Sequence, residues 1–193
     1  MTERHEMPPR GKAALLAARL AEEVPELTTD RLTLRAPRVA DFELYARIVL
    51  EQDGHRLFGL ADRAEAWHDF TNYAAGWLLH GHGIWTVTPR SGGAALGFVL
   101  IGLEPGDREP ELGYLFSPDH REMGHGHEAA TEARRFALDT LRLPSLVSYI
   151  GADNAASLVL AERLGAHRDH EAEALLGEAG IQVWRHAGPE GGA

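Results

Sequence analysis

The sequence predicts one domain of mixed α/β class, built around a central sheet. Residues Gly97–Gly102 are apolar throughout, as expected of a strand that is buried on both faces. A second apolar run, over 112–116, is followed by a glycine-rich loop and a segment with helical character. The chain has 193 residues, which is enough for one good core and too short for two comfortable ones.

The first 25 residues are expected to form an N-terminal extension of this domain. Residues 1–10 are polar and contain Pro8-Pro9, so they are expected to be disordered or loosely held. Residues 12–24 are rich in alanine and leucine, which favours a helix that ends before Pro25. Apolar side chains at positions 15, 16, 20 and 24 give this helix one apolar face. That face packs either on the domain or on a second subunit, so a homodimer is one of the two alternatives.

Strand and helix patterns then alternate as far as the central run. Leucines alternate with polar residues over 32–35, which is typical of a half-buried strand, and a helix follows from Asp41. Helical spacing of apolar residues returns over 61–79, and two strands over 84–87 and 95–103 are joined by a turn. After the central helix, which extends to Leu141, the predicted elements are a strand over 146–150, a helix from Asp153 or Asn154 to Gly165, a strand over 181–186 and a tail over 188–193.

The loop after the central strand has the composition of an anion-binding site. It reads Arg121-x-x-Gly124-x-Gly126 and leads into a helix N-terminus, where backbone N–H groups lack intrahelical partners and the helix dipole is positive. Glycines there let the backbone approach a phosphate closely. A Walker A loop is excluded because Lys12 is the only lysine, and position 129 is alanine rather than the third glycine of a dinucleotide-binding fingerprint.

Three segments together resemble one known family. They are the loop Arg121-x-x-Gly124-x-Gly126, the opening Leu27-x-Thr29-Asp30-Arg31-Leu32-x-Leu34-Arg35, and Asp153-Asn154-x-x-Ser157 followed by Glu162-Arg163-Leu164-Gly165. In this order they resemble the GNAT superfamily of acyl-CoA-dependent N-acetyltransferases, and within it the RimJ/RimL-like branch. The resemblance covers residues 26–187. It implies a strongly twisted mixed sheet of about six or seven strands with helices on both faces, in which the strands over 112–116 and 146–150 splay apart.

The resemblance also implies where acetyl-CoA would bind. The pantetheine arm would lie in the gap between the splayed strands, and a backbone N–H near Leu115 or Phe116 would polarise the thioester carbonyl. The predicted cofactor-binding residues are Leu115, Phe116, Arg121, Glu122, Met123, Gly124, His125, Gly126, His127, Asn154 and Ser157. Two loop positions depart from the family pattern, because members often carry glycine in place of Glu122 and an aromatic residue in place of His125. A protonated His125 would partly offset the charge of Glu122.

Two residues are the predicted catalytic groups. Glu111 stands at the start of the splayed strand and is either the base that takes a proton from the amine or a surface glutamate in a turn. Ser157 either protonates the departing thiolate or only caps its helix. Tyr114 lies on the central strand and is expected in the core. The aromatic residues over 67–77 either line an acceptor pocket or form core.

The implied reaction is transfer of acetyl from acetyl-CoA to a primary amine by direct attack in a ternary complex. The acceptor is a protein N-terminal α-amine or a small-molecule amine. The alternative is a non-catalytic CoA-binding or regulatory module that retains the fold.

Composition restricts the other classes of function. A net charge of −10 makes nucleic acid an unfavourable partner and would attract a cationic amine. The absence of cysteine excludes a thiol nucleophile and a thiolate metal site. His125 and His127 could lie close together at the start of the helix, but a zinc site usually needs three or four fixed ligands, and these two lie on the predicted phosphate-binding loop, so no bound metal is expected. No apolar run suggests a membrane span or signal peptide, so a cytoplasmic protein is expected.

Overall fold

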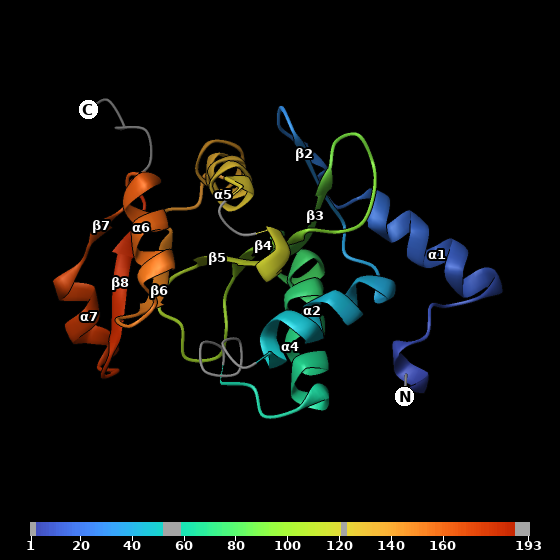
Figure 1. Ribbon diagram of the computed structural model, residues 1–193, viewed down its shortest axis with the longest axis horizontal. Helices are drawn as coiled ribbons and strands as arrows, with labels where there is room; N and C mark the ends of the chain where they lie inside the picture. Colours follow the sequence, from blue (N-terminus) through green and yellow to red (C-terminus); the bar gives the residue numbers. More distant parts are fainter. Residues whose placement is uncertain (1–2, 52–58, 121–122, 188–193) are drawn as a thin grey trace.

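A single mixed sheet forms the centre of the molecule in the computed structural model, which describes residues 3–51, 59–120 and 123–187 (Figure 1). Its eight strands follow the order β1-β2-β3-β4-β5-β6-β8-β7 within these ranges. The strands are β1 (Leu27–Thr28), β2 (Leu32–Arg35), β3 (Ile84–Pro89), β4 (Gly97–Gly102), β5 (Glu111–Phe116), β6 (Val147–Gly151), β7 (His167–Arg168) and β8 (Ile181–Arg185). The predicted mixed fold is therefore confirmed. The sheet has more strands than predicted because β1 and β7 are two-residue edge strands, too short to show an alternating pattern.

Helices connect these strands and cover the sheet. They are α1 (Gly11–Glu22), α2 (Phe42–Leu50), α4 (Arg63–Leu79), α5 (His125–Arg135), α6 (Ala155–Arg163) and α7 (His170–Leu176). Shorter turns are the 3-10 segments Arg4–Glu6, Val39–Asp41 and Pro118–His120, and the π-helical segment Phe136–Thr140 that extends α5. The sequence analysis did not predict α7, whose seven residues span only two turns.

Two cores lie on opposite faces of the sheet. On one face, the small residues Ala129, Ala130 and Ala133 of α5 pack on Leu34, Val87, Val99 and Leu112. On the other face, α2 and α4 place Phe42, Tyr45 and Phe70 against Phe98 and Leu115. Figure 1 shows α5 on one side of the sheet and α2 and α4 on the other. The predicted helices on both faces are therefore present, because alternate residues of β4 and β5 are buried in different cores.

The aromatic residues of α4 belong mainly to the cores. Phe70 is 3% exposed and packs beside Phe42 and Phe98, and the ring of Trp77 lies edge-on to that of Trp85. The alternative of core residues is therefore confirmed for Phe70 and Trp77, in preference to an acceptor pocket.

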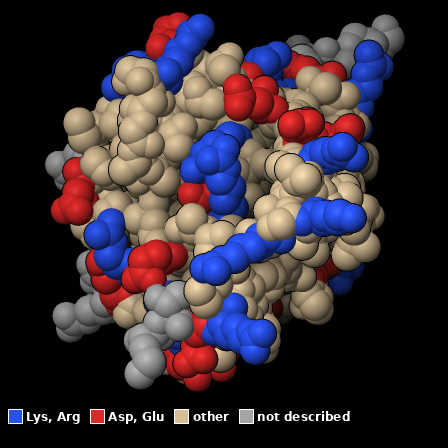
Figure 2. Space-filling view, turned by 90° about the vertical axis from the view of Figure 1, so that its right-hand side faces the viewer, with Lys and Arg blue, Asp and Glu red and all other residues tan. Residues whose placement is uncertain are grey.

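The apolar face of α1 is exposed. Leu15, Leu16 and Leu20 are each more than half exposed, and only Val24, after the helix, packs on the sheet core. Figure 2 views the side of the molecule that carries α1, where acidic and basic side chains are interspersed among uncharged areas. A homodimer through this helix stays a prediction. Within the described residues, no helix has the length and apolarity to cross a membrane.

The strands β5 and β6 are parallel neighbours that touch at one end only. Their single paired position is Glu111 with Val147, whereas β5 pairs with β4 along its whole length, from Glu111 to Phe116. The two strands therefore part after Glu111, as the sequence analysis predicted, and α5 and α6 follow their diverging ends.

Candidate active site

The glycine-rich loop leads into the N-terminus of α5, at the open end of the split between β5 and β6. Gly124 is the N-cap of α5 with φ 79° and ψ 0°, a left-handed conformation that favours glycine. The Glu128 N–H donates to the Gly124 carbonyl at 3.1 Å, so the N–H groups of residues 125–127 precede this helical hydrogen bond. These groups and the helix dipole suit an anion. The predicted residues from Met123 to His127 come together here, whereas Arg121 and Glu122 lie outside the described residues.

His125 does not supply positive charge to this loop. Burial, together with the nearby charge of Arg31, lowers the pKa of His125, so the imidazole is neutral at neutral pH. The protonated ring that would offset the charge of Glu122 is therefore not present at neutral pH, and Glu122 itself lies outside the described residues. His125 Nδ1 has no hydrogen-bond partner among the described residues.

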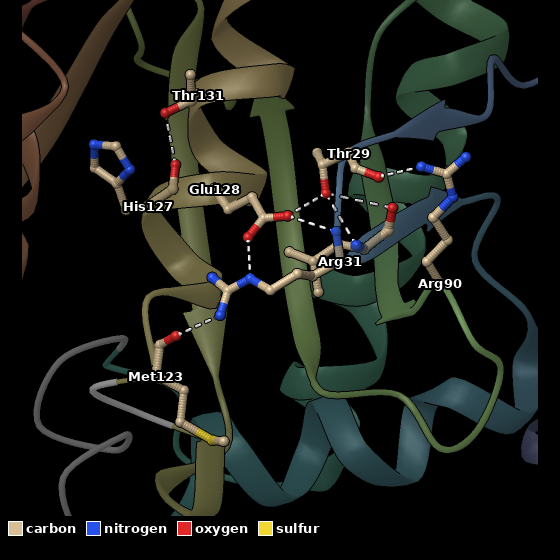
Figure 3. A network of polar contacts seen from close by, with 8 residues as sticks. Thr29, Arg31, Arg90, Met123, His127, Glu128 and Thr131 are labelled. Atoms are coloured by element: carbon tan, nitrogen blue, oxygen red, sulfur yellow. Dashed lines mark hydrogen bonds and ion pairs between the residues drawn. The ribbon is translucent and has the colours of Figure 1, made fainter.

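A polar network connects this loop to the turn between β1 and β2 (Figure 3). The carboxylate of Glu128 accepts hydrogen bonds from Thr29 Oγ1 at 2.5 Å, from the Arg31 N–H at 3.0 Å and from Arg31 Nε at 2.6 Å. Burial favours the protonated form of Glu128, but these donors outweigh it and lower its pKa. Arg31 Nη1 in turn donates to the Met123 carbonyl at 3.0 Å, which fixes the loop.

Sequence reasoning quoted Arg31 in a family-like motif but assigned it no role. Its partner Glu128 is 97 residues away, so no local pattern links them. Arg31 also places Nη2 3.3 Å from the position that a Cβ on Gly124 would take, and its side chain is 52% exposed. The network thus brings a cationic group to the anion-binding end of α5.

The edge of β5 that faces the split carries backbone groups of alternate residues. The Val147 N–H donates to the Pro110 carbonyl on the β6 side, and the Ser117 N–H donates to Leu96 on the β4 side. In antiparallel pairing these directions alternate, so the Tyr114 and Phe116 N–H groups face β6 and the Leu115 N–H faces β4. Of the two predicted thioester contacts, Phe116 is the one on the side of the split.

Glu111 occupies the closed end of the split. Its side chain is half-buried, and Oε1 accepts a hydrogen bond from the Tyr149 N–H at 3.4 Å. Burial, together with the negative charges of Asp107 and Glu104, raises the pKa of Glu111 to about 8. A carboxyl group with such a pKa takes up and releases protons near neutral pH, as a general base requires.

Acidic and phenolic side chains from other elements lie near enough to Glu111 to interact with its charge. Burial raises the pKa of Asp69 on α4 to about 6, and the Tyr45 hydroxyl of α2 donates a short hydrogen bond to its carboxylate. Burial also raises the pKa of Tyr45 and of Tyr73, so both phenols stay neutral. Negative charge gathered at a buried site attracts a cationic ligand.

The N-terminus of α6 forms the other side of the split. Asn154 is the N-cap, and its Oδ1 accepts from the Ser157 N–H at 3.2 Å, which confirms one of the two predicted caps. The interpretation of Ser157 as the residue that caps this helix is wrong, because the side chain of Asn154 has that role. Tyr114 reaches across from β5 and donates from its hydroxyl to the Ser157 carbonyl at 3.1 Å. Tyr114 is half-buried at the split and packs only partly against the core.

The described part of the chain holds no group of three or more His, Cys, Asp or Glu that could bind a metal ion. His82 instead contacts the Ile101 carbonyl at 2.9 Å through Nδ1, and its ring stacks with that of His80.

This chain is similar to known proteins in sequence and fold. The profile of the acetyltransferase (GNAT) domain matches residues 31–167. A solved acetyltransferase from Agrobacterium tumefaciens str. C58 is 33% identical with a TM-score of 0.80, and the match covers 86% of this chain and 95% of that one.

More distant solved structures share the fold. A putative ribosomal-protein-serine acetyltransferase from Vibrio cholerae is 23% identical (TM-score 0.65; 86% of this chain, 98% of that one). The spermidine N-acetyltransferase of Vibrio cholerae, solved with CoA and spermine, is 14% identical (TM-score 0.61; 81% and 94%). With a domain profile that spans most of its length and a split sheet that ends at a glycine-capped helix, this chain belongs to the GNAT family of acetyltransferases.

Proposed function

We propose that the protein transfers an acetyl group from acetyl-CoA to a primary amine by direct attack in a ternary complex. The observation that carries this proposal is the position of Glu111, a carboxyl group of raised pKa at the closed end of a split whose open end is a helix N-terminus. An anion site and a proton acceptor thus lie at the two ends of one slot, as an acyl-CoA thioester and an incoming amine require.

The residues of this slot fit acetyl-CoA at each end. The N–H groups of residues 125–127 would hold the diphosphate, because Gly124 has no side chain to interfere at this left-handed position. Arg31 would add positive charge beside them, and the predicted contact of Arg121 would add more. The pantetheine arm would lie along the edge of β5, and Asn154 and Ser157 would contact it from α6.

Each group then has one step in the reaction. A cationic acceptor first releases one proton to solvent, because only the neutral amine has a lone pair. The amine nitrogen then attacks the thioester carbonyl carbon, and its next proton passes through bridging water to Glu111, which lies at the other end of β5 from Phe116. The Phe116 N–H faces the developing oxyanion. The tetrahedral adduct collapses to an amide and breaks the carbon–sulfur bond. Ser157 passes a proton to the departing thiolate and regains one from the solvent, to which Glu111 releases the proton that it took. The products are the N-acetylated amine and CoA.

The acceptor is a cationic amine, either a protein N-terminal α-amine or a small-molecule amine. The acidic groups around Glu111 support this class, since Asp69, Glu104 and Asp107 concentrate negative charge there. The family resemblance in the opening and in α6 supports the RimJ/RimL-like branch.

Thermal unfolding with acetyl-CoA, followed by a screen of amines for release of free thiol, tests the proposal. At about 100 times its dissociation constant, acetyl-CoA should stabilise the fold by about 2.7 kcal/mol and raise Tm by several degrees. Binding without amine-dependent or slow hydrolytic thioester loss would instead support the alternative of a non-catalytic CoA-binding module. The absence of any shift would contradict both.

Replacing Arg31 with alanine is expected to raise the Kd of acetyl-CoA by about tenfold, because the Met123 carbonyl loses its donor and the site loses a charge. Glu128→Ala should have a similar effect, and the double variant should add little, since the two residues act as a unit. Isothermal titration calorimetry measures all three. Arg90→Ala is the matched control. Arg90 follows β3 and donates to the carbonyl of Thr29, which lies in the same turn as Arg31, but Arg90 does not reach the glycine-rich loop. Equal effects of Arg31→Ala and Arg90→Ala would contradict the assignment.

A further inference from the structure

The split between β5 and β6 begins where one backbone hydrogen bond of the parallel ladder is replaced by bonds to side chains. The ladder starts where the Val147 N–H donates to the Pro110 carbonyl at 3.0 Å, around the paired position of Glu111 with Val147. In a continued parallel ladder the Tyr149 N–H would donate next to the Leu112 carbonyl. Instead, the Tyr149 N–H donates to Glu111 Oε1 at 3.4 Å, and Ser148 Oγ donates to the Leu112 carbonyl at 2.6 Å. Side chains therefore occupy both members of the first missing rung.

An irregularity of β5 against its other neighbour does not account for the split. The register of β5 with β4 is continuous over six residue pairs, from Glu111 with Gly102 to Phe116 with Gly97. The change is confined to the side of β6, where the two side-chain hydrogen bonds replace the backbone bond.

His186 completes a hydrogen-bond chain that spans three strands. It follows β8, its N–H donates to the Leu146 carbonyl at 2.9 Å, and its side chain is 3% exposed. Its Nε2 lies 3.0 Å from Ser148 Oγ. A serine hydroxyl has one proton, which here goes to Leu112, so Ser148 must accept from a protonated His186 Nε2. Nδ1 then carries no proton, and it has no partner among the described residues.

The hydrogen bonds from His186 through Ser148 to the Leu112 carbonyl keep their protonation state at neutral and alkaline pH. Burial lowers the pKa of His186 to about 4, and the charges of Arg134 and His167 act in the same direction. A neutral His186 therefore orients the Ser148 hydroxyl at any neutral or alkaline pH.

We propose that Ser148 and His186 are positioning residues that hold the slot between β5 and β6 open for the acyl-CoA arm. The inference rests on the proposed function. Without the Ser148 hydroxyl, the Leu112 carbonyl lacks a donor, and the Tyr149 N–H is the group that a continued parallel ladder would supply. Pairing these two groups would extend the ladder by one rung into the slot. Neither residue contacts the reacting atoms, so the expected effect is on binding of the thioester.

Steady-state kinetics of Ser148→Ala test this role with two thioesters. The KM should rise by about tenfold, the equivalent of one buried hydrogen bond, while kcat stays within about twofold. The rise should be equal for acetyl-CoA and for acetyl-pantetheine, which has no phosphates, because the slot holds the arm that both share. Arg31→Ala, a variant of the phosphate end, should affect acetyl-CoA alone.

Matched variants separate this effect from a loss of stability. Ser148→Thr keeps the hydroxyl and should restore the wild-type KM, and His186→Gln keeps a donor toward Ser148 and should be milder than His186→Leu. Thr88→Val removes another buried sheet hydroxyl, which donates to the Thr33 carbonyl at 3.3 Å away from the slot. A KM for Ser148→Ala equal to that of Thr88→Val would overturn the inference.

Amide hydrogen exchange of Tyr149 tests the same inference without turnover. If the ladder extends in Ser148→Ala, this amide should exchange at least about tenfold more slowly than in the wild type, because it gains a backbone partner. Unchanged or faster exchange would overturn the inference even in an active enzyme. Failure of the wild type to bind acetyl-CoA would instead contradict the proposed function. The exchange rate of the Tyr149 amide would still decide whether Ser148 and His186 keep the two strands apart.

Discussion

Replacing Glu111 with glutamine is expected to lower kcat by about 10²–10⁴-fold near pH 8, with the Kd of acetyl-CoA within about twofold of the wild type. An amide cannot take a proton from the attacking amine. Glutamine retains a carbonyl oxygen where Glu111 Oε1 accepts from the Tyr149 N–H, so the closed end of the split should keep its structure. Assays of thiol release measure kcat, and isothermal titration calorimetry measures the Kd of acetyl-CoA.

The pH dependence of the wild type follows from the same group. Only ionised Glu111 acts as a base, and its pKa is raised to about 8, so kcat should rise with pH and level off above that value. Glu111→Gln should lose this limb. Because the folded protein binds the Glu111 proton more tightly than the unfolded chain, wild-type stability should fall as pH rises from the ordinary glutamate pKa of about 4.3 to about 8. The glutamine variant should lack this loss of stability.

Asp107→Asn is the companion variant of this test. The charge of Asp107 raises the pKa of Glu111, and its carboxylate accepts from the Glu104 N–H at 2.6 Å, a contact that asparagine can keep. The alkaline limb should therefore move to lower pH while the maximal rate is retained. A Glu111→Gln enzyme of wild-type rate, or a limb that does not move in Asp107→Asn, would show that another group is the base.

Local sequence patterns predicted the parts of this fold that depend on neighbouring residues. The apolar run of β4, the strand–loop–helix passage into α5 and the N-cap at Asn154 all have their cause within a few positions of the chain. The glycine at position 124 also has a local cause, because its left-handed backbone conformation at the N-cap favours glycine. The order of these patterns was enough to predict the central sheet, whereas its split was implied only by the family resemblance.

The contacts between distant segments were not accessible in this way. Glu128 is fixed by a turn 97 residues earlier, and Ser148 acts between Leu112 and His186 only because the strand register places them together. Tyr114 was assigned to the core because an aromatic residue on a buried strand usually belongs there. It packs partly against the core, and its hydroxyl also reaches α6, because β6 diverges from β5.

Replacing Gly124 with arginine is expected to abolish the Tm increase that acetyl-CoA causes. At φ 79° a residue with a Cβ is strained by about 1–2 kcal/mol, so Tm should fall by a few degrees without ligand. The new Cβ would lie 3.3 Å from Arg31 Nη2, and a second guanidinium would enter the space where the diphosphate is proposed to bind. Steric exclusion and the displacement of Arg31 should both weaken binding beyond detection.

Two controls separate the loss of binding from the backbone strain. Gly177→Arg places the same side chain at φ 73° after α7, with no atom within 4 Å of its Cβ, and should lower Tm by a similar amount while keeping the full acetyl-CoA shift. Gly124→Ala carries the strain of the left-handed N-cap without the bulk and charge, so it should retain part of the shift. If Gly124→Arg responded to acetyl-CoA as Gly177→Arg does, the diphosphate could not lie at the N-terminus of α5. The split between β5 and β6 would then need a ligand that approaches from another side.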